Sequence, residues 1–217
     1  MSYYVSKCLL TYIELMTKQE NNFPVTRRQQ AIVDAAKRII VSQGFENLTI
    51  RAIAREMSVT EGALYRHFKS KHEIISLLID DVEATLLAVI DKPAHLSKDP
   101  IAKLKEMFFA HLSNAEQRKG MTLIVINESF TIRDIKIKAK MLKVMSRYQE
   151  TIKDVLREGI KLKLIDKHVN IEAAGITFFG MVQAAVTFWA LKDYSYHLKS
   201  RTLDRMFEQY IKGLCSK

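Results

Sequence analysis

The chain has 217 residues, of which 48% are hydrophobic, so it can bury one large core or two modest ones, and a disordered chain is not expected. Only seven Gly and three Pro occur, which favours long helices with short connections and argues against a β fold with many turns. The formal net charge of +10 fits a polyanionic partner without identifying one.

An N-terminal extension, residues 1–23, precedes the first clear helix signal. It lacks the form of a signal peptide, because Glu14 interrupts its apolar stretch and no small-residue cleavage site follows. Its apolar residues share one helical face: Leu9, Tyr12, Ile13 and Met16. We expect an additional amphipathic helix or an appended segment here, and the sequence assigns it no function.

Metal-binding and catalytic signatures are missing from the sequence. Cys8 and Cys215 lie near opposite ends, so we expect two free thiols in a reducing cytoplasm. The six histidines show no paired metal spacing, and there is no Gly-rich phosphate loop, His-Glu-x-x-His or nucleophile elbow. We therefore expect no metal, no cofactor and no enzymatic activity.

The first helix is predicted to begin after Thr26. Thr26-Arg27-Arg28-Gln29 has the form of a capping box, and Gly44 ends the helix after about Gln43. Its apolar residues recur at helical spacing: Ile32, Ala35, Ala36, Ile39 and Ile40. These residues predict an amphipathic helix with one buried face.

Two shorter helices are predicted next. Thr49 caps one that runs from Ile50 to about Met57, and the other covers Glu61 to Phe68 after a break at Ser58-Val59-Thr60. Two short helices joined by a turn of about three residues follow the helix-turn-helix plan. The expected buried side consists of Ile53, Ala54, Met57, Val59, Leu64 and Phe68.

The stretch EGALYRHFKSKHE, Glu61–Glu73, places glycine at a helix start beside aromatic and basic residues. Because glycine weakens a helix, Gly62 indicates that another molecule comes close to this backbone. Ser70-Lys71-His72-Glu73 has the form of a second capping box and starts a long helix. Between Pro24 and His72, nine Lys or Arg against four Asp or Glu give +5, half of the net charge of the chain.

Thr49–Ile74, TIRAIAREMSVTEGALYRHFKSKHEI, resembles the helix-turn-helix of the tetracycline-repressor (TetR) family of bacterial transcription regulators. The shared features are Thr-x-x-x-Ile-Ala, a turn ending in Val, Leu-Tyr-x-His-Phe, and a Lys after a cap. The resemblance covers about 45 residues, from Thr26 to Glu73. The family usually has Gly in the turn where this chain has Ser58, and a left-handed conformation there would cost Ser roughly 1 kcal/mol.

The resemblance implies a set of DNA contacts. The expected contacts to the DNA backbone are Thr49, Arg51, Tyr65, His67 and Lys71. The expected contacts to base edges are Thr60, Glu61, Gly62 and Ala63. Phosphate contacts would set the position on the duplex, and base-edge contacts would set the sequence. Core packing is the alternative for Tyr65, capping or packing is the alternative for His67, and Arg66 is expected to be a solvated charge.

The rest of the chain is also predicted to be helical, with an ambiguity at Gly120–Thr131. That stretch is rich in Ile and Val, but no partner strand is apparent, so we expect a helix. The other expected helices are Asp99–Ala115, Asp134–Lys163, Asn170–Leu191 and Thr202–Leu214. Asp134–Lys163 carries nine Lys or Arg and four Asp or Glu; a solvated face is the default interpretation, and a second nucleic-acid surface is the alternative.

Ala173–Leu191 contains no charged residue and is close to the length of a membrane span. Gln183 and the interior threonines and glycines argue against a span, so we expect a helix buried in a subunit interface. Small residues would let another helix approach closely: Gly175, Gly180, Ala184 and Ala185. With the last helix, residues 170–214 predict a four-helix homodimer interface, as the family dimerises, and therefore a palindromic operator.

The resemblance further implies a small-molecule effector bound among the C-terminal helices. The candidate lining residues are Phe108, His111, Leu112, Asn127, Phe130, Met141, Met145 and Phe178, with plain core packing as the alternative for each. Among these, His111 and Asn127 are expected on inward faces, where they would orient a polar end of the effector.

The sequence thus predicts an all-α protein with a three-helix DNA-binding domain at 24–72 and a larger effector-binding and dimerisation domain at 73–217. The expected function is a cytoplasmic transcriptional repressor that binds double-stranded DNA as a homodimer. An apolar or amphipathic effector is expected to release it from the DNA. A DNA-binding protein of the same fold that recruits a protein partner and senses no small molecule is the alternative.

Overall fold

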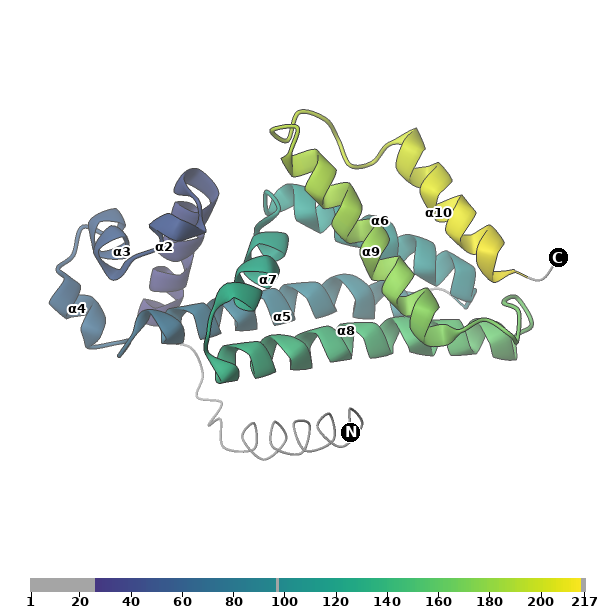
Figure 1. The fold of residues 1–217 in the computed structure, drawn as a ribbon, viewed down its shortest axis with the longest axis horizontal. Coiled ribbons are helices and arrows are strands. Elements are labelled where there is room, and N and C mark those ends of the chain that lie inside the picture. The colour runs from purple at the N-terminus through teal and green to yellow at the C-terminus, as the bar shows by residue number, and fades with distance from the viewer. Residues whose placement is uncertain (1–25, 97, 216–217) are drawn as a thin grey trace. The chain divides into compact units, whose positions relative to one another are not determined.

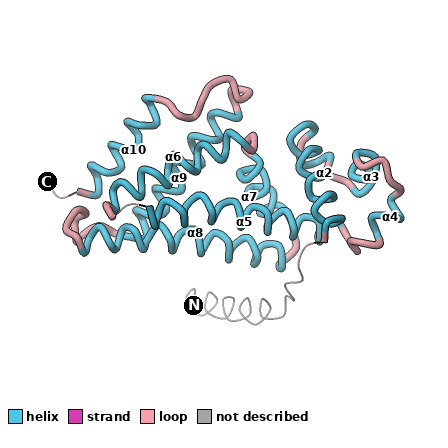
Figure 2. Tube along the Cα trace, turned by 180° about the vertical axis from the view of Figure 1, so that it is seen from behind, coloured by secondary structure: helices cyan, strands magenta, loops and turns pink. Residues whose placement is uncertain are grey.

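The computed structural model describes residues 26–96 and 98–215, with side chains at 93–96 left undescribed. Every regular element in these residues is helical (Figures 1 and 2). The elements are α2 (Arg27–Gln43), the 3₁₀ turn η1 (Phe45–Asn47), α3 (Ile50–Glu56), α4 (Glu61–Tyr65), α5 (Lys71–Leu96), α6 (Pro100–Gln117), α7 (Met121–Thr131), α8 (Ile135–Lys161), α9 (Ile171–Ala190) and α10 (Arg201–Leu214). The helix predicted within residues 1–23 lies outside the described part of the chain.

Tertiary contacts divide the chain into two compact units. One unit ends at Leu77 and also includes Ile132–Leu142; the other holds Leu78–Thr131 and Lys143–Lys217. The sequence-based division at 72/73 therefore lies close to the contact-based one in α5. It does not anticipate that Ile132–Leu142, which holds the first turns of α8, belongs with the helix-turn-helix.

The N-terminal unit is built on α2, against which η1 and α3 pack, with α4 packed on α3. Its first helix begins as predicted: the Thr26 hydroxyl accepts from the Gln29 N–H, and the Gln29 side chain accepts from the Thr26 N–H, 3.0 Å away. The core consists of the α2 stripe with the apolar residues Phe45, Leu48, Ile53, Ala54, Leu64 and Phe68. Met57 and Val59, expected to be buried, are partly exposed.

The structure differs from two expectations, one for the end of α4 and one for the start of α5. The recognition helix α4 ends at Tyr65, so the chain leaves the helix three residues earlier than Phe68. Glu73 accepts from the backbone N–H of Lys69 at 2.9 Å, whereas a capping box centred on Ser70 would direct that carboxylate to Ser70. The shorter recognition helix leaves His67 and Phe68 in the bend that leads into α5.

In the C-terminal unit, α6 contacts α7, α9 and α10, and α9 contacts α7 and α10. Asp99 caps α6, with its carboxylate accepting from the Ile101 N–H at 2.9 Å, and Asn170 caps α9 by accepting from the Ala173 N–H at 3.0 Å. The ambiguous stretch forms helix α7, as expected. The core of this unit is rich in aromatic rings, which meet mostly edge to face, for example Phe108 with Phe178.

Helix α9 is apolar on more of its surface than the unit itself buries. By length and composition it could cross a membrane, but one such helix is weak evidence, because core helices of soluble proteins meet the same test. Only 33% of its most apolar stretch is buried within the described chain. Much of this helix therefore has no apolar partner among the described residues.

Candidate DNA interface and effector site

The start of α3 holds two predicted contacts, Thr49 and Arg51. Both are exposed. The Thr49 hydroxyl accepts from the Ala52 N–H at 3.0 Å and so fixes the first turn of α3. Arg51 projects from this fixed turn, which is the arrangement a backbone-contacting side chain needs.

The turn between α3 and α4 contains the strained residue that the sequence indicated. Ser58 has φ 53°, in the left-handed region that favours glycine. The Val59 N–H returns to the Ala54 carbonyl at 2.9 Å and closes the turn. Ser58 thus adopts the left-handed conformation for which Gly, the usual family residue here, is better suited.

The recognition helix α4 presents its first residues to solvent. Thr60 caps it by accepting from the Ala63 N–H at 3.3 Å, and Glu61 and Gly62 are exposed while Ala63 is half-buried. A Cβ added at Gly62 would meet nothing within 4 Å. The fold itself therefore does not require glycine at this position. This agrees with the expectation that another molecule approaches the backbone of α4 closely.

The two sides of the segment 64–68 separate cleanly. Leu64 and Phe68 are buried, at 0% and 2% exposure, whereas Tyr65 is 53% exposed and His67 is exposed. The expected core positions for Leu64 and Phe68 are confirmed, and Tyr65 is not a core residue. Its phenol is free to reach a phosphate.

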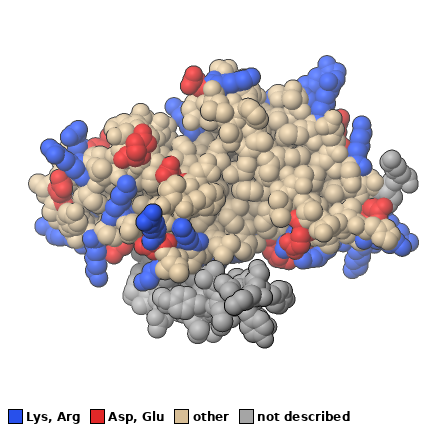
Figure 3. Space-filling model, in the orientation of Figure 1, with Lys and Arg blue, Asp and Glu red and all other residues tan. Residues whose placement is uncertain are grey.

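Lys71 lies at the first turn of α5 and is half-buried. Its ammonium stands 5.4 Å from the centre of the Phe45 ring, a cation–π contact that holds the charge beside the helix start. Lys and Arg side chains also project from the surface over α2, α3 and α4 (Figure 3). All nine predicted DNA contacts therefore belong to one compact unit, and each is at least partly exposed.

The predicted effector residues do not all come together. Phe108, His111, Leu112 and Phe178 are buried in the C-terminal unit. The expected inward orientation is wrong for Asn127 and Phe130: both are exposed, Phe130 to 63%. Helix α7 is apolar on nearly every side, and the face it buries carries Met121, Thr122, Val125, Ile126 and Ser129 instead.

The two predicted methionines also differ from expectation. Met141 is buried, but it belongs to the segment Ile132–Leu142 of the N-terminal unit. Met145, one turn later on α8, belongs to the C-terminal unit and is only half-buried. Helical periodicity places both on one stripe but gives no sign that the division between the units passes between them.

A polar pair lies inside the aromatic core. His111 Nδ1 on α6 is 3.1 Å from the hydroxyl oxygen of Tyr148 on α8, and both residues are at most 4% exposed. Burial lowers the pKa of His111 to about 4, so the ring is neutral at neutral pH, and burial raises the pKa of Tyr148 above its usual range. The phenol can therefore donate to an unprotonated Nδ1.

Two buried polar groups could not be identified as candidate site residues from the sequence. Tyr148 is one, since its place on an apolar stripe suggests only packing. The other is Thr122, 6% exposed, whose hydroxyl has no hydrogen-bond partner among the described residues. A buried donor left unpaired costs roughly 1–3 kcal/mol, so native proteins seldom keep one without a reason.

The connection between α9 and α10 forms a separate pocket of about 300 Å³. It is lined by Lys192, Tyr196, Ser200, Thr202 and Leu203, and no predicted effector residue contributes to it. Within the described residues, no group of three or more metal-binding side chains occurs.

A helix-turn-helix with an exposed recognition helix, joined to a separate helical unit, defines a DNA-binding transcriptional regulator. The chain belongs to the tetR family of bacterial regulatory proteins: its N-terminal family model matches residues 32–78, and the model described as YsiA-like protein, C-terminal region, matches residues 79–213. The boundary between these two matches falls within α5, one residue from the boundary between the compact units.

Individual relatives are distant but nearly full-length. Nucleoid occlusion factor SlmA from Vibrio cholerae is 25% identical over 81% of this chain and 89% of its own length. The fatty acid metabolism regulator protein of Bacillus subtilis is 22% identical over 86% of this chain and 95% of its own length. The crystal structure of transcriptional regulator FadR from Bacillus subtilis in complex with stearoyl-CoA has the same fold, with a TM-score of 0.74 at 21% identity over 85% of this chain and 98% of that one.

Proposed function

We propose that this regulator is a cytoplasmic repressor that binds a palindromic operator as a homodimer and is released by an amphipathic effector with a long apolar part. The observation that carries the effector proposal is the neutral His111–Tyr148 pair, enclosed in an aromatic core. Small-molecule sites combine mostly apolar linings with a few convergent polar groups, and this core has that composition.

The chemistry of the pair limits the effector. A neutral imidazole and a phenol offer hydrogen bonds but no compensating charge, so a buried ionised group on the effector would be disfavoured. An ester or thioester carbonyl joined to an aliphatic chain suits both the polar pair and the rings around it. The similarity to a regulator of fatty acid metabolism and to a structure with stearoyl-CoA supports a fatty acyl thioester as the first candidate.

The homodimer proposal rests on the exposed face of α9. Three large apolar side chains on or next to this helix are exposed: Ile176 to 64%, Phe188 to 62% and Leu191 to 75%. Gly180 and Ala184 are exposed between them, and a Cβ on Gly180 would meet nothing within 4 Å. Small residues flanked by large apolar ones let the same helix of a second copy pack closely across a two-fold axis.

The alternative, a DNA-bound protein that recruits a protein partner and senses no small molecule, is favoured by a different observation. The rings of Phe108, Phe178, Phe207 and Tyr210 contact one another in the core, where an effector would have to separate them. The similarity to a nucleoid occlusion factor also fits a DNA-binding protein of this fold outside metabolic sensing. We rank this function second, because packing of aromatic rings alone leaves the buried Thr122 hydroxyl unexplained.

Thermal unfolding and DNA-binding measurements with stearoyl-CoA, octanoyl-CoA and coenzyme A alone separate the two functions. We expect stearoyl-CoA to raise the melting temperature and to weaken binding to genomic operator fragments, with coenzyme A inactive. His111→Leu should weaken the response, and so should Thr122→Val, which replaces the unpaired hydroxyl by a methyl group of similar size. Stabilisation by acyl thioesters without any change in DNA affinity would contradict effector-controlled repression.

A further inference from the structure

We infer that the first turn of α8 and the loop just before it form a second DNA-backbone contact surface, which engages duplex flanking the half-site that α4 reads. The surface consists of Arg133, Lys136 and Lys138, named here the α8 basic end. This inference rests on DNA binding by the helix-turn-helix and adds a contact outside that motif.

The α8 basic end is part of the DNA-binding unit. Ile132–Leu142 clusters with the helix-turn-helix and not with the rest of α8. Two contacts fix it there: His72 Nδ1 lies 3.3 Å from Asp134 Oδ2, and the Lys140 ammonium donates to the Ser76 hydroxyl at 2.7 Å. Both partners are in the first turns of α5, and His72 directly follows Lys71, a predicted phosphate contact.

The cations of the α8 basic end are available to a ligand. Arg133, Lys136 and Lys138 are exposed, and none has an ion-pair partner within residues 26–96 and 98–215. The adjacent carboxylate is already engaged, because Asp134 Oδ1 accepts from the Lys136 N–H at 2.8 Å and from the Ile137 N–H at 3.3 Å. Between 132 and 142, four cations and one carboxylate give a net charge of +3.

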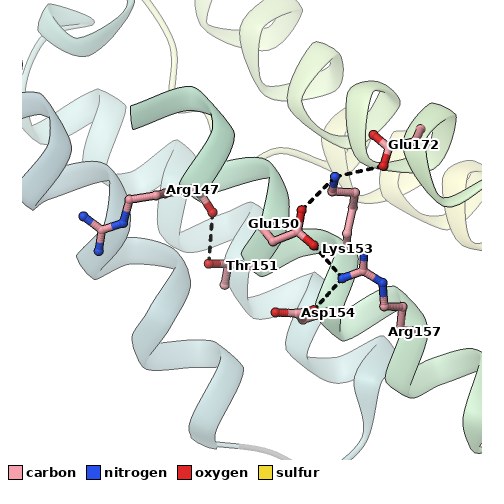
Figure 4. A network of polar contacts seen from close by, with 7 residues as sticks. All are labelled: Arg147, Glu150, Thr151, Lys153, Asp154, Arg157 and Glu172. Atoms are coloured by element: carbon pink, nitrogen blue, oxygen red, sulfur yellow. Dashed lines mark hydrogen bonds and ion pairs between the residues drawn. The ribbon is translucent and has the colours of Figure 1, made fainter. Parts of the chain in front are cut away.

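The later turns of α8 differ in this respect (Figure 4). Lys153 pairs with Glu150 at 2.8 Å and with Glu172 at 2.9 Å, and Arg157 pairs with Glu150 at 2.7 Å and Asp154 at 2.6 Å. These cations would have to give up a carboxylate before they could bind a phosphate. Lys153 and Arg157 on α8 are thus neutralised by carboxylates, whereas Arg133, Lys136 and Lys138 have no ion-pair partner among the described residues.

Unpaired cations beside a phosphate-contacting helix start match the chemistry of duplex DNA. A duplex carries about one charge per 1.7 Å of its axis, so DNA that continues past the half-site offers further phosphates to cations beyond Lys71. Such contacts are independent of sequence and appear as salt dependence, with a slope that changes by about 0.9 for each phosphate neutralised. The α8 basic end would therefore strengthen binding to long duplexes more than to short ones.

The test compares binding of the full chain to random-sequence duplexes of 20 and 60 base pairs at several salt concentrations. The variant is Arg133→Gln with Lys136→Gln and Lys138→Gln. The control is Lys105→Gln with Lys161→Gln and Lys167→Gln, three exposed cations of the C-terminal unit that have no ion-pair partner in the described residues. Both triple variants remove the same formal charge, and circular dichroism melts check that each folds.

We expect the α8 variant to lose about tenfold or more in affinity for the long duplex, with the salt slope reduced by about 1–3. The short duplex should lose less, and the control should stay close to wild type on both. Equal losses of DNA affinity in the two variants would show that only the net charge matters. Equal losses of affinity for both duplex lengths would place the contact inside the half-site. Either result overturns the inference. Unchanged DNA affinity with lost binding to phosphatidylglycerol vesicles would also overturn it, in favour of an anionic lipid surface.

Failure of this inference is distinguishable from failure of DNA recognition itself. If wild-type protein binds neither duplex, nor any genomic fragment, the DNA-binding function fails and the inference with it. If wild-type protein binds both duplexes and Tyr65→Phe weakens binding while the α8 variant does not, only the α8 surface is contradicted.

Discussion

His111 and Tyr148, 37 residues apart in the chain, meet inside the core of the C-terminal unit with Nδ1 of the imidazole 3.1 Å from the phenol oxygen. The pair joins α6 to α8 and leaves a neutral histidine where water does not reach. Its consequences can be measured without knowing the effector.

Acid should destabilise the protein through His111. The folded-state pKa of about 4 lies below the ordinary value of 6.5, so between these values the unfolded chain binds more protons than the folded one. Stability is therefore complete above pH 6.5 and falls as the pH decreases towards 4. This group alone should cost about 2 kcal/mol between pH 7 and pH 5.

Urea unfolding at both pH values checks this prediction. In His111→Gln, which cannot titrate, the loss between pH 7 and pH 5 should be smaller than in wild type by about that amount. Parallel pH profiles for the two proteins would show that His111 is not buried in its neutral form.

Gly62→Ala should separate folding from DNA recognition. Nothing within 4 Å opposes the added methyl group, and alanine is the better helix former by up to about 1 kcal/mol, so stability should hold or rise. DNA affinity should fall nonetheless, since the backbone of α4 can no longer approach the base edges. Gly213→Ala in α10, also open to solvent, is the matched control for both quantities, and a Gly62→Ala protein with wild-type DNA affinity would refute the close-approach explanation.

Position 58 should accept glycine and resist β-branched residues. Ser58 adopts φ 53°, and a left-handed residue with a Cβ costs roughly 1–2 kcal/mol. Glycine avoids this strain, but it offsets part of the gain because it loses more conformational entropy on folding. Ser58→Gly should therefore be neutral or stabilising, and Ser58→Val should be less stable than Ser58→Gly by about 1–2 kcal/mol. Thermal or chemical unfolding of the three proteins decides the order.

Ala184→Glu should give monomers. Ala184 is exposed in the single chain, so glutamate fits the protomer but would bury two unpaired charges across a two-fold interface, at several kcal/mol each. Ala185 is a poorer test, because it is 7% exposed and a charge there would disrupt the core of the protomer itself. Sedimentation of Ala184→Glu beside Ser113→Glu, an exposed position on α6, measures the effect; a dimeric Ala184→Glu protein would exclude this face.

Local signals foretold most of the helices, since capping residues such as Thr26, Thr49, Asp99 and Asn170 act within one turn of the chain. The orientation of α7 could not be foretold. Its sequence is apolar at most positions, so contacts with α6 and α9 decide which face is buried, and Asn127 falls outside.

Long-range relationships were equally out of reach. Helical spacing puts Tyr148 on an inward stripe but cannot tell that His111 faces it. The assignment of Ile132–Leu142 to the DNA-binding unit depends on contacts with residues such as His72 and Ser76, more than 60 positions away. Family resemblance supplied the candidate DNA contacts at α4 because that motif is local, and it supplied far less for the variable C-terminal helices.

The central claim is that α4 and its neighbouring turns bind operator DNA as half of a symmetric pair. Hydroxyl-radical footprinting on genomic fragments that the protein retains, with wild type and Tyr65→Phe side by side, tests it most directly. We predict two protected half-sites related by a palindrome, about 34–36 Å apart or a multiple of that distance, with protection weakened at both halves in Tyr65→Phe. A single unpaired protected stretch, or protection that Tyr65→Phe and Gly62→Ala leave unchanged, would contradict the account.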